Sequence, residues 1–449
     1  MSEEQTQKLE RVLNLRDLYL LIVGSVIGSG IFLVPAAVLQ QTKGSVGFAF
    51  LVWLVGGLLS LLGALCYGEL SARNPQAGGL YIYIRDSFGK LSAFLYGWAL
   101  FFVIANAGVA TLAVAFPAYL NEIIPLDPVL RKVISVLMIA VVTFVNVRGT
   151  RQSADLQNWT TFIKGGAIII MASLCLIVGQ QFSAFHSIWP AQADSSLFQG
   201  FGVAMIAVLW AYEGWQFATF NAAEVIDPQH NYPKGFLFGT LTLMALYIFA
   251  NFGYLAALGV NKATNSQSIA AASLSVVAGQ WAGKAVAAAI LVSMFSAANS
   301  IVLTASRVYY AMAADGLFFK KLAEVHPRFH TPAFSIIAGA VWATILALSG
   351  TFEQLFTYVV FTGWIFYALA AASVFAYRKK KIGENASYRV PGYPITPILF
   401  IISGFALVAN TLVAKPREAM FGVLIVCSGI PAYLFWRRNL PPSPQGTPS

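Results

Sequence analysis

Apolar residues run along this chain in long stretches separated by short polar segments that hold most of the charges. An α-helix needs about 20 apolar residues to cross the hydrocarbon core of a bilayer. The pattern therefore predicts an all-α polytopic membrane protein with twelve transmembrane helices. The predicted spans are, approximately, 16–40, 45–72, 87–119, 130–147, 154–179, 197–226, 234–259, 282–313, 333–350, 353–377, 395–413 and 417–436.

The composition agrees with a lipid environment. Only 10% of the residues are charged, against about 25% in soluble domains, and the mean hydropathy is +0.71. Cys66, Cys175 and Cys427 lie within apolar stretches, without a CxxC pair, so no metal site or disulfide framework is predicted. The metalloprotease, serine-hydrolase and P-loop motifs are absent. We expect neither an enzyme nor a cofactor.

The distribution of lysine and arginine predicts the topology. An even number of spans places both termini on one side, and that side then holds 20 of the 28 basic residues against seven on the other. Basic loops mark the cytoplasmic face of a membrane protein. The net charge of +10 is therefore explained without a nucleic-acid partner. We expect a multi-pass protein of the cytoplasmic membrane with cytoplasmic termini and no signal peptide.

The first predicted span contains three glycines within seven residues, Gly24, Gly28 and Gly30. Each glycine weakens a helix by about 1 kcal/mol relative to alanine. Close packing of two helices through Gly24 and Gly28 is one interpretation. The other is an unwound segment at Gly28, Ser29 and Gly30, whose free N–H groups bind an anion while the carbonyls of Val26 and Ile27 face a cation.

The sixth span is a second candidate for a break. It carries the sequence Trp210-Ala211-Tyr212-Glu213-Gly214, with a carboxylate and a glycine at mid-membrane depth. A charge there is costly unless it faces a cavity or a partner. Glu213 could recognise a cationic side chain, accept a proton, or only donate and accept hydrogen bonds within the pocket.

The two breaks occupy corresponding positions, because spans one and six each open a set of five. Paired broken helices are typical of transporters built as inverted repeats. We therefore predict a cytoplasmic segment at 1–15, a first repeat at 16–180, a second repeat at 197–378, two peripheral helices at 395–437 and a disordered cytoplasmic tail at 438–449.

Such a site suits a zwitterion. The amides of Gly28, Ser29 and Gly30 would bind an α-carboxylate, and carbonyls near Ile27 and Trp210 would bind an α-ammonium group. In span eight, Ser293, Ser296, Ser300 and Thr304 share one helical face. They either bond neighbouring helices or line a pocket, and we expect Asn299 to line the pocket. The full set of predicted substrate-binding residues is Val26, Ile27, Gly28, Ser29, Gly30, Trp210, Tyr212, Glu213, Gly214 and Asn299.

Four motifs resemble the amino acid–polyamine–organocation superfamily and, within it, the L-type amino acid transporter family. They cover roughly residues 15 to 380. The motifs are Gly28-Ser29-Gly30-Ile31-Phe32, the run from Ala64 to Leu70 followed by Gly78 to Tyr83, the run from Trp210 to Trp215 followed by Glu224 to Pro228, and Asn299 to Arg307.

The resemblance implies five plus five inverted-repeat helices, alternating access and sodium-independent exchange. It also implies that Trp210 is a lid over the substrate and that Lys164 replaces a sodium ion, although Lys164 could instead snorkel to the membrane surface. Animal exchangers carry a cysteine in the loop that corresponds to 119–132, and this chain has none there. We therefore expect no disulfide-linked heavy chain.

The function predicted from the sequence is secondary transport of small or medium neutral L-amino acids by exchange. A proton-coupled importer of amino acids or polyamines that uses Glu213 is the alternative. A channel or a receptor without transport is a more distant one.

Overall fold

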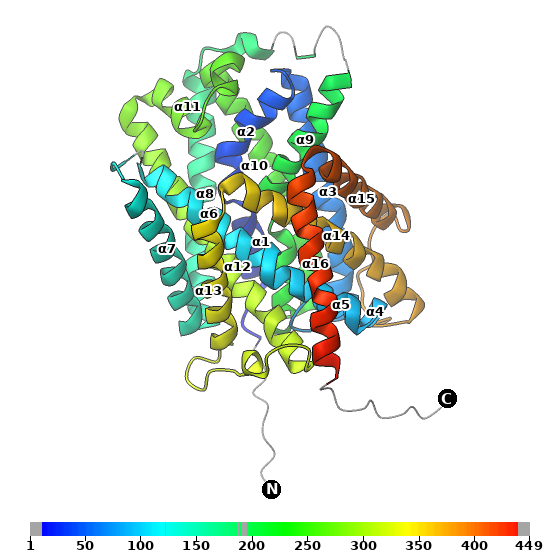
Figure 1. The fold of residues 1–449 in the computed structure, drawn as a ribbon. Coiled ribbons are helices and arrows are strands. Elements are labelled where there is room, and N and C mark those ends of the chain that lie inside the picture. The colour runs from blue at the N-terminus through cyan, green and yellow to red at the C-terminus, as the bar shows by residue number, and fades with distance from the viewer. Residues whose placement is uncertain (1–10, 122, 186–187, 190–194, 439–449) are drawn as a thin grey trace.

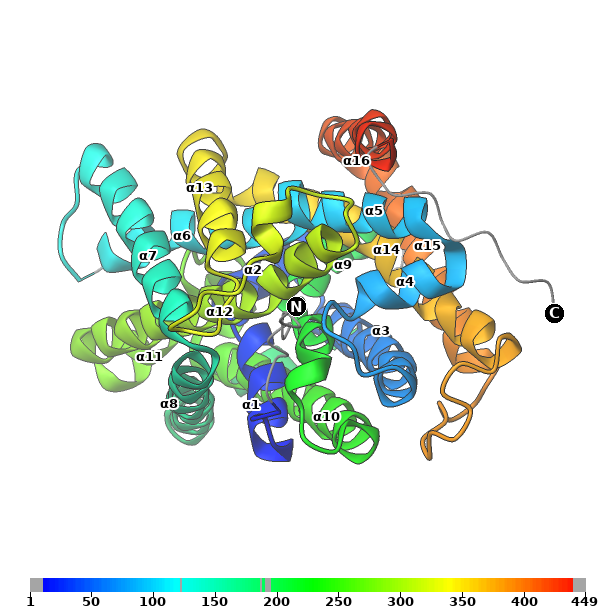
Figure 2. The ribbon, with the colours of Figure 1, turned by 90° about the horizontal axis from the view of Figure 1, so that it is seen from below.

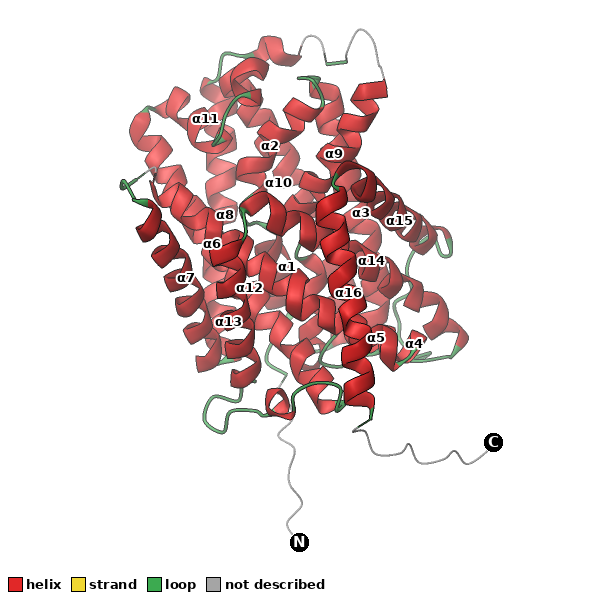
Figure 3. Cartoon of the chain, in the orientation of Figure 1, coloured by secondary structure: helices red, strands yellow, loops and turns green. Residues whose placement is uncertain are grey.

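The computed structural model describes residues 11–121, 123–185, 188–189 and 195–438. Helices make up nearly all of this part, and its only β contact is an isolated bridge between Leu13 and Val225. The helices pack side by side in one bundle (Figures 1 and 3). The beginning of α1 and the end of α16 lie at the same end of the bundle (Figure 1). The predicted all-α fold is confirmed.

The first half of the chain follows the predicted spans, with a break in the first. Its long helices are α1 (Leu15–Val26), α2 (Gly30–Gln41), α3 (Val46–Arg73), α5 (Lys90–Ala99), the π-helical turn η1 (Leu100–Ile104), α6 (Ala105–Asn121), α7 (Pro128–Arg148) and α8 (Thr150–Val178). The pair α1 and α2 bends by 44° at the intervening residues, where a single continuous helix would otherwise run.

The second half contains a corresponding interruption. Its long helices are α9 (Ser195–Ala211), the 3₁₀ helix η3 (Trp215–Glu224), α10 (Pro228–Thr264), α12 (Gln280–Ala314), α13 (Ala333–Ser349), α14 (Phe352–Lys379), α15 (Ile395–Ala414) and α16 (Pro416–Arg437). Four short elements were not predicted: α4 (Leu80–Phe88), η2 (Phe182–Phe185), α11 (Ile269–Ala278) and η4 (Lys320–Ala323).

Ten segments of the described chain are long and apolar enough to cross a membrane, and the bent pair α1 and α2 supplies an eleventh. The predicted span at 333–350 corresponds to α13, which is apolar but shorter. The count of twelve therefore stays a prediction, as does the division into repeats at 16–180 and 197–378. Of the predicted tail at 438–449, only Arg438 lies within the described residues.

The centre and the edge of the bundle differ in burial. In the most apolar window of α5 to α6, 83% of the residues are buried inside the protein, against 28% for α15 and 22% for α16. Figure 2 shows α16 and α7 at the outside of the bundle and α12 near its centre. The predicted peripheral position of the last two helices agrees with this arrangement.

Candidate substrate site at two broken helices

The break between α1 and α2 leaves donors without helical partners. α1 begins at a capping box formed by Asn14 and Asp17 and ends at Val26. Within the described residues, no backbone hydrogen bond starts from the amides of Gly28, Ser29 or Gly30. The Ser29 hydroxyl is buried and also lacks a partner. These groups lie at the N-terminus of α2, the positive end of its dipole, which favours an anion.

The second break lies against the first. α9 ends at Ala211, and Gly214 has a φ of +126°, which favours glycine. A Cβ atom at Gly214 would lie 2.6 Å from the Ser25 carbonyl oxygen. The Ser25 hydroxyl donates to the Gly214 carbonyl oxygen at 3.0 Å. Close approach of the two unwound segments therefore requires glycine here.

Tyr247 on α10 connects the same two segments. Its hydroxyl lies 2.9 Å from the Ala211 carbonyl oxygen and 3.2 Å from that of Val26. The ring packs edge-on against Trp53, with centroids 5.6 Å apart. One hydroxyl proton is thus shared between the C-terminal ends of α1 and α9, where carbonyls lack helical partners.

Lys164 is fully buried and donates hydrogen bonds to the C-terminal end of α1 at the first break. Its Nζ atom donates to the carbonyl oxygens of Gly24 at 2.5 Å and Ile27 at 2.8 Å, and to Ser296 Oγ on α12 at 3.0 Å. Because α8 begins at Thr150, earlier than predicted, Lys164 lies deeper in its helix. The side chain points inward to α1 and α12, and the snorkelling interpretation does not fit this placement.

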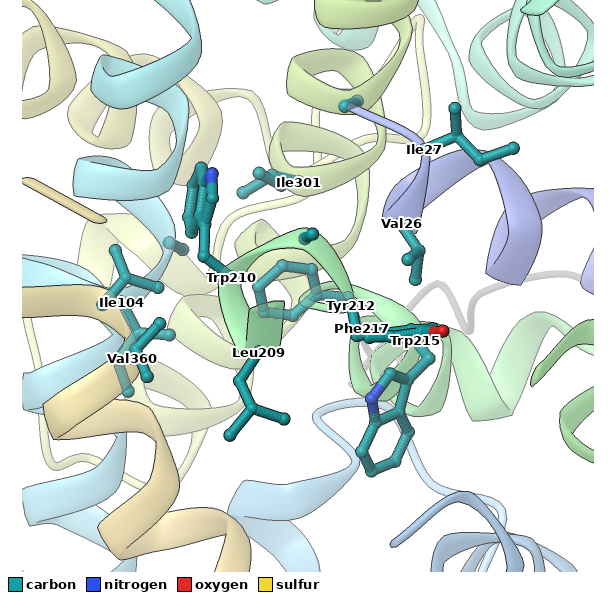
Figure 4. Packing of buried hydrophobic residues seen from close by; sticks show 14 of the residues in the cluster. Val26, Ile27, Ile104, Leu209, Trp210, Tyr212, Trp215, Phe217, Ile301 and Val360 are labelled. Carbon is teal, nitrogen blue, oxygen red and sulfur yellow. The ribbon is translucent and has the colours of Figure 1, made fainter. Parts of the chain in front are cut away.

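A small cavity lies between the two breaks. Its volume is about 20 Å³, which holds a water molecule but not an amino acid. Figure 4 shows Trp210, Phe217, Val26, Ile104 and Ile301 around this region. The site is therefore closed in this conformation, and the cavity walls must separate before a substrate fits.

Glu213 lines this cavity and is bonded to neutral groups. Its Oε1 atom accepts hydrogen bonds from Gln216 Nε2 and, at 2.5 Å, from the Tyr367 hydroxyl. Among the described residues it has no ion-pair partner. A carboxylate held only by neutral donors can gain a proton or meet a cationic group without first breaking a salt bridge.

Six of the ten predicted substrate-binding residues line the cavity: Val26, Gly28, Ser29, Gly30, Trp210 and Glu213. The other four do not. The Ile27 carbonyl oxygen faces Lys164 and Ser293, and the Tyr212 ring packs against Trp53 and Tyr247. Gly214 contacts the backbone of α1, as described above.

Asn299 requires a correction, because it faces away from the cavity. Its Oδ1 atom accepts hydrogen bonds from Asn146 Nδ2 at 2.9 Å and Ser153 Oγ at 3.2 Å, which joins α12 to α7 and α8. Ala297 and Ile301, four residues apart on α12, line the cavity instead. Asn299 does not line the cavity because apolar residues occupy the cavity face of this helix. The lining residues that the sequence analysis missed are Ser25, Ile104, Gly108, Leu112, Phe217, Ala297, Ile301 and Val359.

A larger opening lies beyond Trp210, at the end of the bundle away from the termini. Its volume is about 350 Å³, and its walls come from α2, α9 and α14. Phe356 lines this vestibule and packs against Trp210, with ring centroids 6.0 Å apart. The two aromatic side chains therefore separate the vestibule from the central cavity.

The opposite end is closed by ion pairs and backbone contacts. Glu69 is buried between Arg73, at 2.8 Å, and Arg378, at 2.7 Å. Arg307 contacts Glu224 at 3.1 Å. The amides of residues 12 and 13 donate to the Glu224 carbonyl oxygen at 2.9 Å. These two hydrogen bonds hold residues 12 and 13 against the C-terminal end of η3.

Arg85 on α4 adds a connection to the end of α12. It contacts Asp315 at 2.9 Å, and the Tyr81 hydroxyl donates to the same carboxylate at 2.8 Å. Burial and the Asp315 charge together raise the pKa of Tyr81 above its ordinary value. Tyr81 therefore stays protonated and remains a donor to Asp315 near neutral pH.

Comparison with known families gives one match over nearly the whole chain. The model of the amino acid permease family matches residues 13–430. This range includes both broken helices, Lys164 and the ion pairs of the closed end.

Several characterised proteins are similar over most of their length. The serine/threonine exchanger of Bacillus subtilis is 32% identical over 422 residues, which cover 93% of this chain and 95% of that protein. The human cystine/glutamate transporter is 30% identical, covering 97% and 88% of the two chains. The human b(0,+)-type amino acid transporter 1 is 29% identical, covering 97% and 89%.

Proposed function

The chain belongs to the amino acid permease family, and from this premise we propose that it exchanges small or medium neutral L-amino acids by alternating access, independently of sodium. The observation that carries this proposal is the donor set at the start of α2. Three free amides and the unpartnered Ser29 hydroxyl match the acceptor oxygens of an α-carboxylate.

The character of the cavity walls supports a neutral side chain. Ile104, Leu112, Ile301 and Val359 are apolar, and Glu213 is the one charged side chain among the lining residues. A cationic side chain could pair with Glu213, but an anionic one would be repelled. The serine/threonine exchanger among the relatives is in accord with small neutral substrates.

Lys164 supports independence from sodium. A cation is needed near Gly24 and Ile27, because their carbonyl oxygens lie at the C-terminal end of α1. The ammonium group already satisfies both oxygens from a fixed position on α8. A metal ion at the same oxygens would have to displace it.

Counterflow in proteoliposomes tests the proposal. Vesicles preloaded with unlabelled serine should take up labelled serine faster than empty vesicles, and replacement of sodium by choline should leave the rate unchanged. Equal uptake by loaded and empty vesicles would refute exchange. Uptake that does not saturate with concentration would instead indicate a channel, and saturable binding without uptake would indicate a receptor.

Proton-coupled import is the second candidate, and Glu213 favours it. Its carboxylate faces the cavity and is bonded only to Gln216 and Tyr367, so protonation costs no ion pair. An acid-outside gradient should then drive accumulation in empty vesicles, and Glu213→Gln should abolish it. Under exchange, the same variant should retain counterflow. Polyamines fit less well, since they carry no carboxylate for the α2 donors.

We further propose that the chain lies in the cytoplasmic membrane with its termini in the cytoplasm and works without a disulfide-linked heavy chain. The vestibule beyond Trp210 would then open outward. Cys66 and Cys175 are buried, and Cys427 is exposed on the peripheral helix α16. Treatment with a reducing agent should therefore leave the apparent mass and the counterflow rate unchanged.

A further inference from the structure

A basic cavity lies at the end of the bundle where α1 begins. It shares no lining residue with the substrate site. Its volume is about 540 Å³, and its lining residues are Phe144, Val145, Arg148, Gln152, Arg328 and Phe329. They come from the end of α7, the start of α8 and the turn before α13, which lie close together in Figures 1 and 2. Two guanidinium groups and no carboxylate therefore border this space.

The turn that presents Arg328 is well organised. The amide of His326 donates to the Thr331 carbonyl oxygen at 2.8 Å, and the amide of His330 donates to that of His326 at 2.9 Å. The Thr331 hydroxyl bonds the Val147 carbonyl oxygen on α7 at 2.9 Å. These bonds fix the turn against α7, so Arg328 is held at the same cavity as Arg148.

Neither arginine has an ion-pair partner within the described residues. Arg148 Cζ lies 4.7 Å from the centre of the Phe144 ring, and Arg328 Cζ lies 5.5 Å from that of Phe329. Stacking on a ring occupies the face of a guanidinium and leaves its N–H edge for an acceptor. The nearby Asp155 is already paired with Arg151, at 2.5 Å.

An apolar stripe on α7 leads to this cavity. Val133, Leu137, Val141 and Phe144 are exposed and follow one another at steps of three or four residues. Arg148 continues the same series by four residues. Residues at this spacing share one helical face. An acyl chain along this face would place its headgroup phosphate at the two arginines.

We propose that this cavity binds the headgroup of an anionic phospholipid, with one acyl chain along the exposed face of α7. Bidentate contacts from two guanidinium groups suit phosphate oxygens, and basic pockets between membrane helices recognise such headgroups. The lipid joins α7 to the turn before α13. Lipid binding at this site does not require an amino acid substrate, so it is independent of whether the protein exchanges amino acids.

Native mass spectrometry of the detergent-purified full chain tests the proposal, with dioleoylphosphatidylglycerol and dioleoylphosphatidylcholine as probes. The variant Arg148→Gln with Arg328→Gln should bind the first retained phosphatidylglycerol roughly thirtyfold more weakly, since each of the two arginines near a headgroup contributes on the order of 1 kcal/mol. Retention of phosphatidylcholine should not change.

The matched control is Arg437→Gln with Arg438→Gln at the exposed end of α16, which removes the same charge elsewhere. It should leave the affinity for phosphatidylglycerol unchanged. Equal losses in the two double variants would overturn the proposal in favour of general surface charge, and no loss in either would overturn it outright. Thermal melts without lipid, which should coincide for all three proteins, exclude misfolding.

Discussion

The ammonium group of Lys164 on α8 donates a hydrogen bond to the carbonyl oxygen of Ile27, the residue directly after the end of α1, over 2.8 Å. Ser293 on α12 donates to the same oxygen at 3.0 Å. α8 and α12, which belong to different halves of the chain, thus both donate hydrogen bonds to the unwound segment after α1. Movement of α1 relative to α8 or α12 must break at least one of these bonds.

Lys164→Met should therefore abolish exchange while the protein still folds. The variant leaves the Gly24 carbonyl oxygen without its side-chain donor, at about 1–3 kcal/mol, while the Ile27 carbonyl oxygen keeps only the hydrogen bond from Ser293. It also removes the desolvation cost of a buried cation, which offsets part of that loss. We expect counterflow at least tenfold slower and a modestly lower melting temperature.

Lys284→Met serves as the control for Lys164→Met. Lys284 lies on α12, where its ammonium group is 5.6 Å from the centre of the exposed Trp281 ring. Counterflow and the melting temperature should both stay at their wild-type values. A wild-type exchange rate in Lys164→Met would show that the hydrogen bonds from Lys164 to the end of α1 are not needed for transport.

Gly30 and Gly28 should respond differently to alanine. A Cβ atom at Gly30 would lie 2.5 Å from the Ala211 Cα atom, a backbone atom that cannot move aside, whereas one at Gly28 would lie 3.4 Å from its nearest neighbour, Ala297 Cβ. Gly30→Ala should lower the free energy of unfolding by about 1–3 kcal/mol, as overpacking does, and stop exchange.

Gly28→Ala should fold normally, but its methyl group enters the cavity that the substrate must occupy. We expect a raised KM in counterflow with an unchanged melting temperature. Equal melting temperatures and equal exchange kinetics for the two alanine variants would contradict the close contact between the broken helices.

Asp315→Asn should favour opening of the end that holds the ion pairs. The Arg85–Asp315 pair is partly exposed, so its loss is worth about 0.5–1 kcal/mol, or roughly a two- to fivefold change in population. The readout is thiol modification of Ile301→Cys in the cavity wall, measured from that side in a Cys427→Ser background. Its rate should rise by this factor.

Asp155→Asn is the control for Asp315→Asn, because it removes one charge from the exposed pair with Arg151 at the same end. The rate of modification should not change. A rate that rises equally in both variants would mean that the Arg85–Asp315 pair has no special part in closure.

The sequence predicted most of the spans because twenty apolar residues in succession have few alternatives to a membrane helix. It also located both breaks, since glycines and a carboxylate in a lipid-spanning segment are unfavourable unless the helix opens there. These signals at the breaks are local and need no knowledge of neighbouring helices. Lys164, by contrast, was singled out through the resemblance to the transporter family.

The side of each helix that faces the cavity could not be predicted in the same way. Asn299 carries the more polar side chain, but Ala297 and Ile301 line the cavity, because the rotation of α12 is set by its packing on α7 and α8. Phe217 and Val359 were missed for a similar reason, since apolar side chains on a buried helix give no sign of which neighbour they meet.

The hydroxyl group of Tyr247 connects the ends of α1 and α9, and a second tyrosine on the same helix offers a matched control. Tyr247 and Tyr254 are both buried on α10, but the Tyr247 hydroxyl contacts the carbonyl oxygens of Val26 and Ala211, while the Tyr254 hydroxyl has no hydrogen-bond partner in the described part of the chain. Tyr247→Phe should cost about 1–2 kcal/mol of unfolding free energy and slow counterflow, because two helix ends lose their donor. Tyr254→Phe should be neutral or stabilising, because a buried hydroxyl without a bond is removed. Thermal melts and initial counterflow rates of both variants in the same lipid measure these effects, and equal effects would exclude a role for Tyr247 in coupling the two breaks.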